Sequence, residues 1–281
     1  MLKTRLVREM IEPLAVMEGA GVRLRRSIAT RRLDYLDPFL LFDHFGSADP
    51  ADYLAGFPMH PHRGIETVTY MLAGQVHHAD SLGNSGDLYA GDVQWMTSGR
   101  GIMHEEMPRP VDGKMEGFQL WVNLPARLKM TRPRYQEVRA ASIPAVAQDG
   151  ALVRVVAGQV GETRGPVREI AADPVYLDIR LPAGTTFTQA VSRGHAAFVY
   201  VFEGSGVIGS TGVAATRMLI LDDGDQVQVS AGPQGIRFLL VSGAPLGEPI
   251  ARYGPFVMNT REEIEQALRD LRNGTFVAPT D

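Results

Sequence analysis

The chain has 281 residues, of which 44% are hydrophobic, and it contains no cysteine. This length and composition are enough for one or two packed cores, and the lack of cysteine excludes disulfides and thiolate metal ligands. The formal net charge is -4, with acidic and basic residues interleaved, which argues against direct binding of nucleic acid.

The start of the chain and its hydropathy pattern favour a cytoplasmic protein. Residues 1–5 lead into alternating charged and apolar residues, without the apolar segment of a signal peptide. No run approaches the roughly 18 consecutive apolar residues that a membrane-spanning helix needs. We therefore expect neither a membrane partner nor a nucleic-acid partner, and we expect Arg23, Arg25 and Arg26 to form a solvated strand face.

The distribution of turn residues predicts an all-β protein. Short segments rich in Val, Ile, Thr, Tyr and Phe are separated by 18 Pro and 30 Gly. In chain order, the clearest predicted strands are 66–72, 117–122, 175–181, 195–202 and 237–241. Near the end, a capping box from Thr260 to Glu263 precedes apolar residues at 264, 267, 268 and 271, which predicts an amphipathic helix that Gly274 ends.

A faint internal repeat predicts two halves of similar fold. The segment from Gly64 to Gly74 resembles the segment from Gly194 to Gly204, at an offset of 130 residues. We expect an N-terminal β-barrel over 1–135 and a C-terminal β-barrel over 136–281 that ends in the helix. The positions in the second half that match His60 and His62 are Ala190 and Ser192, so no metal site is expected there.

The histidines of the first half predict a metal site. Five of the seven histidines lie between His60 and His104. Side chains alternate along a strand, so His60, His62 and Glu66 share one face of one strand, and His104 and Glu106 share one face of another. If these strands are neighbours, three imidazoles and one carboxylate can bind one ion and leave positions open for substrate or dioxygen. The spacing leaves open whether Glu66 or Glu106 is the carboxylate.

The residues around these ligands are candidates for a substrate pocket. Phe57, Met59, Met96 and Met103 lie close to the expected ligands in the sequence, although such side chains are more often core. His77 and His78 are expected to be polar surface residues, and His78 is also a candidate for the pocket mouth.

Several blocks of the sequence resemble the pirin family of the cupin superfamily. They are LDPFLLFD (36–43), GFPMHPHRG (56–64), ETVTY (66–70), GDVQWMT (91–97), GRGI (99–102), LWVNL (120–124) and GPFVMNT (254–260). The resemblance implies a bicupin fold of two antiparallel jelly-roll barrels with one mononuclear metal in the first. The implied ligands are His60, His62, His104 and Glu106, so Glu106 is preferred to Glu66, and Glu105 should point away. The implied ion is Fe(II), with Mn, Co, Ni, Cu and Zn as alternatives.

The resemblance also implies two functions that need the same ligands. One is a quercetinase-like dioxygenase, which opens a flavonol or another phenolic compound with O2 and releases CO, with Glu106 as the catalytic base. The alternative is a non-catalytic iron redox sensor that regulates a protein partner. A third interpretation, a metal-free structural bicupin, would leave three converging histidines without a role.

Overall fold

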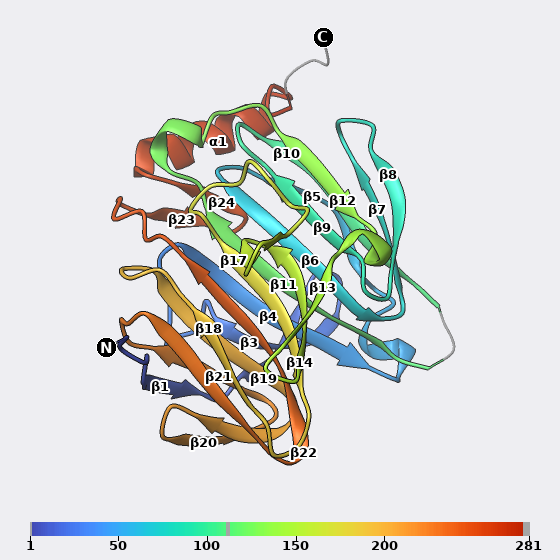
Figure 1. Ribbon diagram of the computed structural model, residues 1–281. Coiled ribbons are helices and arrows are strands. Elements are labelled where there is room, and N and C mark those ends of the chain that lie inside the picture. The colour runs from blue at the N-terminus through green and yellow to red at the C-terminus, as the bar shows by residue number, and fades with distance from the viewer. Residues whose placement is uncertain (1, 111–112, 278–281) are drawn as a thin grey trace. The chain divides into compact units, whose positions relative to one another are not determined.

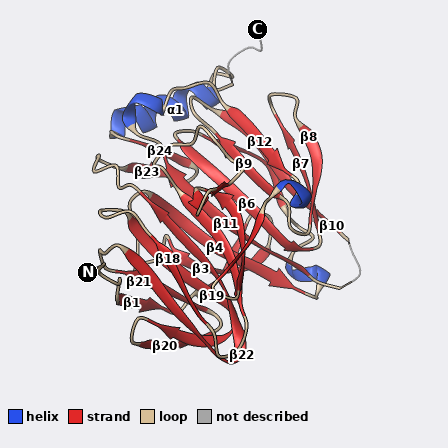
Figure 2. Cartoon of the chain, viewed as in Figure 1, coloured by secondary structure: helices blue, strands red, loops and turns tan. Residues whose placement is uncertain are grey.

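The computed structural model describes residues 2–110 and 113–277, and these residues form an all-β fold of two cupin domains, as expected. Figure 2 shows that strands make up nearly all of the regular structure, together with one longer helix. No helix within the described ranges combines the length and the hydropathy that crossing a membrane would require.

The chain forms two compact units, and each unit includes a terminal segment from the other end of the sequence. The C-terminal cupin unit consists of Met1–Pro13 and Ala141–Pro245, and the N-terminal cupin unit consists of Leu14–Ala140 and Leu246–Asp281. The expected domains 1–135 and 136–281 differ from this division, because they keep each terminus with its own half. The first strand pairs with a strand of the C-terminal unit, and the helix packs on strands of the N-terminal unit.

The N-terminal cupin unit contains two antiparallel sheets and a terminal hairpin with a helix (Figure 1). The seven-stranded sheet has the order β12(Arg134–Val138), β9(Val93–Thr97), β6(Ile65–Ala73), β11(Met115–Asn123), β4(Phe39–Ser47), β3(Val22–Ile28), β2(Leu14–Glu18). The four-stranded sheet has the order β5(Phe57–His62), β10(Ile102–Arg109), β7(Gln75–Asp80), β8(Ser85–Tyr89). The hairpin is β23(Ala251–Tyr253) and β24(Phe256–Met258), the helix is α1(Arg261–Arg272), and short 3-10 turns occur at Pro50–Asp52 and Ala126–Leu128.

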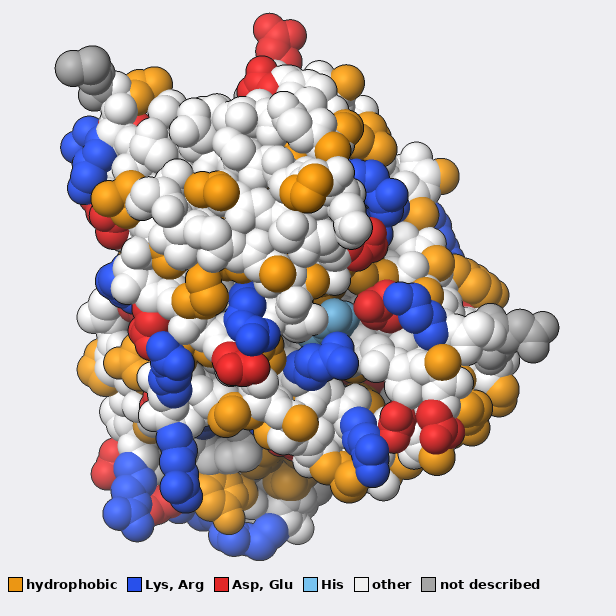
Figure 3. All heavy atoms as spheres, turned by 90° about the horizontal axis from the view of Figure 1, so that it is seen from below, with side chains coloured by type: hydrophobic (Ala, Val, Ile, Leu, Met, Phe, Trp, Pro, Cys, Tyr) orange, Lys and Arg blue, Asp and Glu red, His pale blue; other side chains and the backbone are white. Residues whose placement is uncertain are grey.

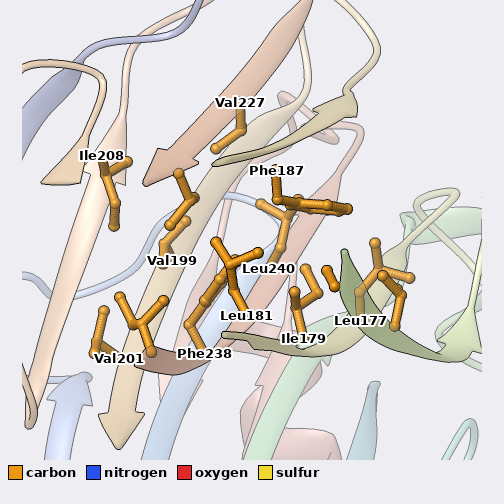
Figure 4. Packing of buried hydrophobic residues seen from close by; sticks show 14 of the residues in the cluster. Leu177, Ile179, Leu181, Phe187, Val199, Val201, Ile208, Val227, Phe238 and Leu240 are labelled. Carbon is orange, nitrogen blue, oxygen red and sulfur yellow. The ribbon is translucent and has the colours of Figure 1, made fainter. Parts of the chain in front are cut away.

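The C-terminal cupin unit is built on one large sheet that packs around an apolar core. Its main path is β1(Val7–Ile11), β21(Arg217–Leu221), β19(Ala196–Ile208), β22(Gln226–Gly243), β17(Val175–Leu181), β14(Ala151–Ala157), β13(Ala145–Gln148), while β18(Thr186–Ala190) pairs with β22 and β20(Thr211–Ala214) with β19. A small ladder joins β15(Gln159–Val160) and β16(Thr163–Arg164), and a 3-10 turn spans Ala140–Ser142. Figure 4 shows Val199, Leu181, Phe238 and Leu240 close together in this core, which also includes Leu177 and buries these side chains almost completely.

The predicted strands are confirmed, but two of them are much longer in the structure. The segments 66–72, 117–122 and 175–181 lie in β6, β11 and β17. The segment 195–202 lies in the longer β19 except for its first residue, and the segment 237–241 lies in the longer β22. The sequence hides the length of β22 because Gly232, Pro233 and Gly235 interrupt its apolar pattern. The repeat glycines have matching left-handed conformations, with φ of 82° at Gly64 and 77° at Gly194. This match supports two halves of similar fold.

Helix α1 has the predicted start and most of the predicted apolar face. The Thr260 side chain accepts a hydrogen bond from the Glu263 amide, and the Glu263 side chain accepts one from the Thr260 amide, so the capping box is present. Ile264 and Ala267 are buried beside β23 and β24, whereas Leu271 is partly exposed. The helix packs on the hairpin of β23 and β24, and Pro255 between these two strands lies close to His62, one of the expected metal ligands.

Candidate metal centre

Two neighbouring strands position the predicted ligands. Strand β5 is the edge strand of the four-stranded sheet and pairs with β10, so that His60 lies opposite His104 and His62 opposite Ile102. An edge position also suits Pro61, which has no amide hydrogen for a second neighbour. Along β10, residues 102, 104, 106 and 108 are buried and the intervening residues are more exposed. This alternation turns His104 and Glu106 inward and Glu105 outward, as expected.

The three predicted histidines form one cluster. The ligand atoms of His60, His62 and His104 all lie within 4.8 Å of one another. His60 Nδ1 is 2.9 Å from the Pro58 carbonyl oxygen, and His62 Nδ1 is 3.3 Å from the Pro255 carbonyl oxygen. A carbonyl oxygen only accepts, so Nδ1 bears the proton in both rings and the neutral form has its lone pair on Nε2. These hydrogen bonds fix the ring orientation, as they do for histidines that bind metals.

The distance between the Nε2 atoms of His60 and His62 fits a cation that both rings bind. The Nε2 atoms of His60 and His62 are 3.1 Å apart, and two lone pairs at this distance repel each other unless a cation lies between them. Metal–nitrogen bonds of about 2.0–2.1 Å can span such a separation. The residues present therefore fit a bound transition metal ion.

His104 adds a third imidazole to the cluster. Its side chain is fully buried, and both of its ring nitrogens lack a hydrogen-bond partner among the described residues. Burial, followed by the nearby His62 and His60, holds the pKa of His104 well below its usual range, and burial lowers the pKa of His62 to about 3. Neutral imidazoles are the form that binds metals, so both rings are prepared as ligands at neutral pH.

The two candidate carboxylates have different surroundings. Glu66 Oε1 accepts a hydrogen bond of 2.8 Å from Thr97, its neighbour across the β6–β9 ladder. Glu106 Oε1 accepts one of 2.7 Å from Thr69, and Glu106 lines the same pocket as His60 and His62. Glu106 is not part of the 4.8 Å histidine group. Its role as the fourth ligand is therefore a proposal that rests on its place in the pocket.

A pocket of about 570 Å³ opens onto the histidine cluster, a volume in the usual range for small-molecule sites. Its apolar lining is formed by Leu24, Leu41, Phe45, Phe57, Pro58 and Trp121. Its charged lining is formed by Glu18, Arg26, Asp43, Glu106 and Arg252. The pocket can therefore hold a planar aromatic molecule with one end at the histidines.

Only one of the five predicted pocket residues lines this pocket. Phe57 does, whereas Met59, Met96, Met103 and His78 are not among its lining residues. Met59 and Met103 alternate with the histidines of their strands, so Met59 is about half exposed and Met103 packs against the cluster around Phe256. Met96 is buried in the large sheet.

His78 is also a correction to the expected surface position, since its side chain is fully buried. Its ring stacks on Tyr135 with centroids 4.7 Å apart, and its Nε2 is 3.2 Å from Asp80. It lies beside His104, with ring centroids 5.5 Å apart, on strand β7 behind the cluster. His77 is partly exposed and pairs with Asp87 at 2.9 Å.

Residues far away in the sequence complete the site, and local patterns did not indicate them. Pro255 fixes His62, and Arg252 lines the pocket. Lys129 is buried and donates to the Gly64 carbonyl, the Asn123 side chain and the Val257 carbonyl at 3.0, 2.8 and 2.9 Å. These bonds join the strand of His62 to the C-terminal segment. The only signal in the sequence was the block 254–260, which resembled the family without indicating a role.

Comparison with known sequences identifies the family. The sequence profile of Pirin matches residues 21–122, and that of the Pirin C-terminal cupin domain matches residues 176–277. A pirin-like protein of Caulobacter vibrioides is 46% identical over 277 residues, which cover 98% of this chain and 100% of that protein. The chain belongs to the pirin family. Human pirin is 43% identical over 91% of this chain and 88% of its own length.

Some pirin-family relatives are named as enzymes. A Pseudomonas aeruginosa relative, 46% identical over 92% of this chain and 93% of its own length, has a name that provisionally assigns it as a quercetin 2,3-dioxygenase. The crystal structure of a quercetin 2,3-dioxygenase from Acinetobacter baumannii is 36% identical, covers 98% of this chain and 99% of that chain, and has a TM-score of 0.89. A bacterial pirin from Escherichia coli in complex with nickel(II) has a TM-score of 0.67 at 18% identity, over 84% of this chain and 99% of that chain, which shows the shared fold.

Proposed function

We propose that this pirin-family protein is a metal-dependent, quercetinase-like dioxygenase that opens flavonols with O2 and releases CO. The observation that supports this proposal best is the coincidence of three clustered histidines, a carboxylate and a largely apolar pocket at one place. Relatives named as quercetin dioxygenases supply the substrate class.

The proposed metal ligands are His60, His62, His104 and Glu106, and Fe(II) is the proposed ion. When bound, such a metal acts as a Lewis acid and as a redox partner for dioxygen chemistry. Imidazole nitrogens with one carboxylate suit Fe, Mn, Co, Ni, Cu or Zn, so reconstitution must compare these ions.

Glu106 is the proposed catalytic base. The 3-hydroxyl of a flavonol must lose its proton before the ring can react, and a carboxylate in the pocket can accept it. Glu106 Oε1 already accepts a hydrogen bond from Thr69, so we assign the transferred proton to Oε2. The apolar side chains around Phe57 and Trp121 would exclude water and hold the flavonol plane against the cluster.

The test is reconstitution followed by an activity assay. Protein freed of metal is loaded under anaerobic conditions with Fe(II), and separately with Mn, Co, Ni, Cu or Zn, and is then mixed with quercetin in air. We expect loss of the flavonol absorption band and release of CO with at least one metal. Glu106→Gln should lower kcat by about 100-fold or more, because general bases contribute roughly 10²–10⁴-fold. The proposal would be refuted if none of these metals supported turnover, or if Glu106→Gln reacted at the wild-type rate.

The same assay separates the enzyme from the redox sensor predicted as the alternative. A sensor would bind metal at the same histidines and show no turnover, and it would capture a protein partner in only one oxidation state.

Figure 3 shows acidic and basic side chains interspersed over the face in view, a distribution that differs from the basic surface of a nucleic-acid-binding protein.

A further inference from the structure

The pocket beside the histidine cluster is lined by two arginines, Arg26 and Arg252, which differ in their hydrogen-bond partners. Arg26 donates to both carboxylate oxygens of Asp43, at 2.8 and 2.7 Å, and to Glu18 at 2.6 Å. A guanidinium held by two carboxylates has most of its donors occupied, and its charge is more than neutralised. Arg26 is therefore a structural part of the pocket and a poor receptor for a further anion.

Arg252 has N–H donors that remain available for a ligand. It donates to the Leu40 carbonyl at 3.1 Å, and no carboxylate within the described ranges lies at ion-pair distance from it. Burial of the guanidinium, followed by the nearby Arg26, lowers the pKa of Arg252, while the carboxylates of Asp34, Asp43 and Glu18 act in the opposite direction from beyond ion-pair distance. An anion brought to this position would gain charge-assisted hydrogen bonds without breaking an ion pair.

The position of Arg252 relative to the histidines is fixed by an aromatic ring. Its guanidinium carbon lies 5.1 Å from the centroid of Trp121, and the same indole packs edge-on against His62 with ring centroids 5.0 Å apart. Stacking on the indole holds the planar guanidinium in one orientation. One indole ring therefore separates the cation from the metal candidates, and both lie on the lining of the same pocket.

We propose that Arg252 is a specificity residue that binds an anionic substituent on the aromatic substrate, at the end of the molecule away from the histidines. This inference rests on the proposed use of the pocket for substrate. Among flavonols and related aromatic hydroxy compounds, the preferred substrates would be those that bear a carboxylate or a comparable anion.

The experiment compares two flavonols that differ in one charge. The probes are 3-hydroxyflavone and its 4′-carboxylate, and their Kd values are measured by calorimetry on nickel-loaded protein under argon, where no turnover occurs. We expect the carboxylate to bind at least about tenfold more tightly than the neutral flavonol, the range of charge-assisted hydrogen bonds. In Arg252→Met the two Kd values should converge to within about twofold, mostly through weaker binding of the carboxylate.

Two variants control for charge and geometry. Arg252→Lys keeps the charge without the planar fork and should retain part of the preference. Arg25→Met removes an exposed positive charge from the same strand as Arg26, outside the pocket lining, and should retain the full preference. Equal binding of both probes to the wild type, an unchanged preference in Arg252→Met, or an equal loss in Arg25→Met would overturn the inference. Because binding is measured without O2, the result does not depend on dioxygenase activity, and the failure of one proposal can be distinguished from the failure of the other.

Discussion

His104 is a buried imidazole whose two ring nitrogens find no hydrogen-bond partner in the part of the chain that the structure describes, so we expect its main interaction to be with a metal ion. We expect metal to raise the melting temperature of the wild type, since a ligand at 100 times its Kd stabilises by about 2.7 kcal/mol. In His104→Ala this increase should vanish, because the central ligand of the cluster is gone. Differential scanning calorimetry with and without added metal measures the effect.

His77→Ala is the matched control for this prediction. His77 is also a histidine of the four-stranded sheet, but it pairs with Asp87 outside the cluster. Its variant should keep the metal-dependent increase. A full increase in His104→Ala would show that the ion binds elsewhere.

Thr69 holds the carboxylate of Glu106 through a hydrogen bond of 2.7 Å, and its hydroxyl is also 3.0 Å from Gln119 Oε1. Thr69→Val keeps the shape of the side chain and removes the hydroxyl. Because residues that orient ligands typically contribute 10–100-fold to metal affinity or activity, we expect a loss of roughly that size. Metal titration and steady-state kinetics on the same preparation measure it. Thr69→Ser should restore most of the loss, and wild-type values in Thr69→Val would contradict the role.

Among single residues, the sequence predicted that the three histidines lie close together, but it did not predict the residues that surround them. The spacing of His60 and His62 and the position of His104 follow from strand alternation alone. Glu66 and Glu106 satisfied the same rule equally, and only the family resemblance separated them. The burial of His78 was missed because the two faces of a strand look alike in sequence when both bear polar residues.

Strand β10 organises the site because it lies between β5 and β7 and pairs with both. An alternating pattern predicts which residues of such a strand share a face, yet it does not predict the neighbouring strands. The edge position of β5 fits Pro61, since proline within sheets is mostly confined to edges, strand starts and bulges. The pairing of His60 with His104 depends on contacts 44 residues apart, which no local rule supplies.

The connection between β11 and β12 contains Lys129, which predicts a pH dependence of stability. Burial lowers the pKa of Lys129 from 10.5 to about 8. Between these values the unfolded chain holds the proton and the folded protein does not, so the free energy of unfolding should rise with pH, by about 3 kcal/mol in total. Below pH 8 both states are protonated and the full cost of burying the charge remains.

Urea unfolding between pH 7.5 and 10.5 measures this dependence. Lys129→Met has no proton to lose at this position, so its free energy of unfolding should lack the rise. The exposed Lys114 provides the control, and Lys114→Met should behave like the wild type. Parallel curves for the wild type and Lys129→Met would show that Lys129 does not cause the effect.

On the scale of the whole molecule, the exchange of terminal segments was the feature that the sequence concealed. The repeat predicted two halves of similar fold, and the strands and the helix were found near their predicted positions. Which unit a terminal segment joins depends on long-range contacts, such as the buried Arg5 with its hydrogen bonds to the carbonyls of Ser192, His195 and Asp222. Composition and periodicity do not encode such partners.

This exchange predicts that the N-terminal half cannot form the metal centre alone. A fragment of residues 1–140 contains all four proposed ligands but lacks Pro255, Val257 and Arg252. We expect the fragment to expose the apolar surface around Leu40 and Ile65 that Val257 covers, and to bind metal at least about tenfold more weakly, since His62 loses the partner of its Nδ1. Metal titration and circular dichroism measure both effects.

The control leaves the chain whole and disturbs the other unit. Arg5→Ala removes contacts inside the C-terminal cupin unit and should lower stability while metal binding is retained. Metal binding by the fragment with the affinity of the full chain would show that the terminal segment is dispensable.

The contribution of Pro255 to the site also fixes the order of events during synthesis. Pro255 follows His104 by 151 residues in the chain. At about 5–20 residues per second, roughly 8 to 30 seconds separate their emergence from the ribosome. During that interval the nascent chain displays all three histidines without the carbonyl that orients one of them. The hydrogen bond that orients His62 can therefore form only after residue 255 has been synthesised.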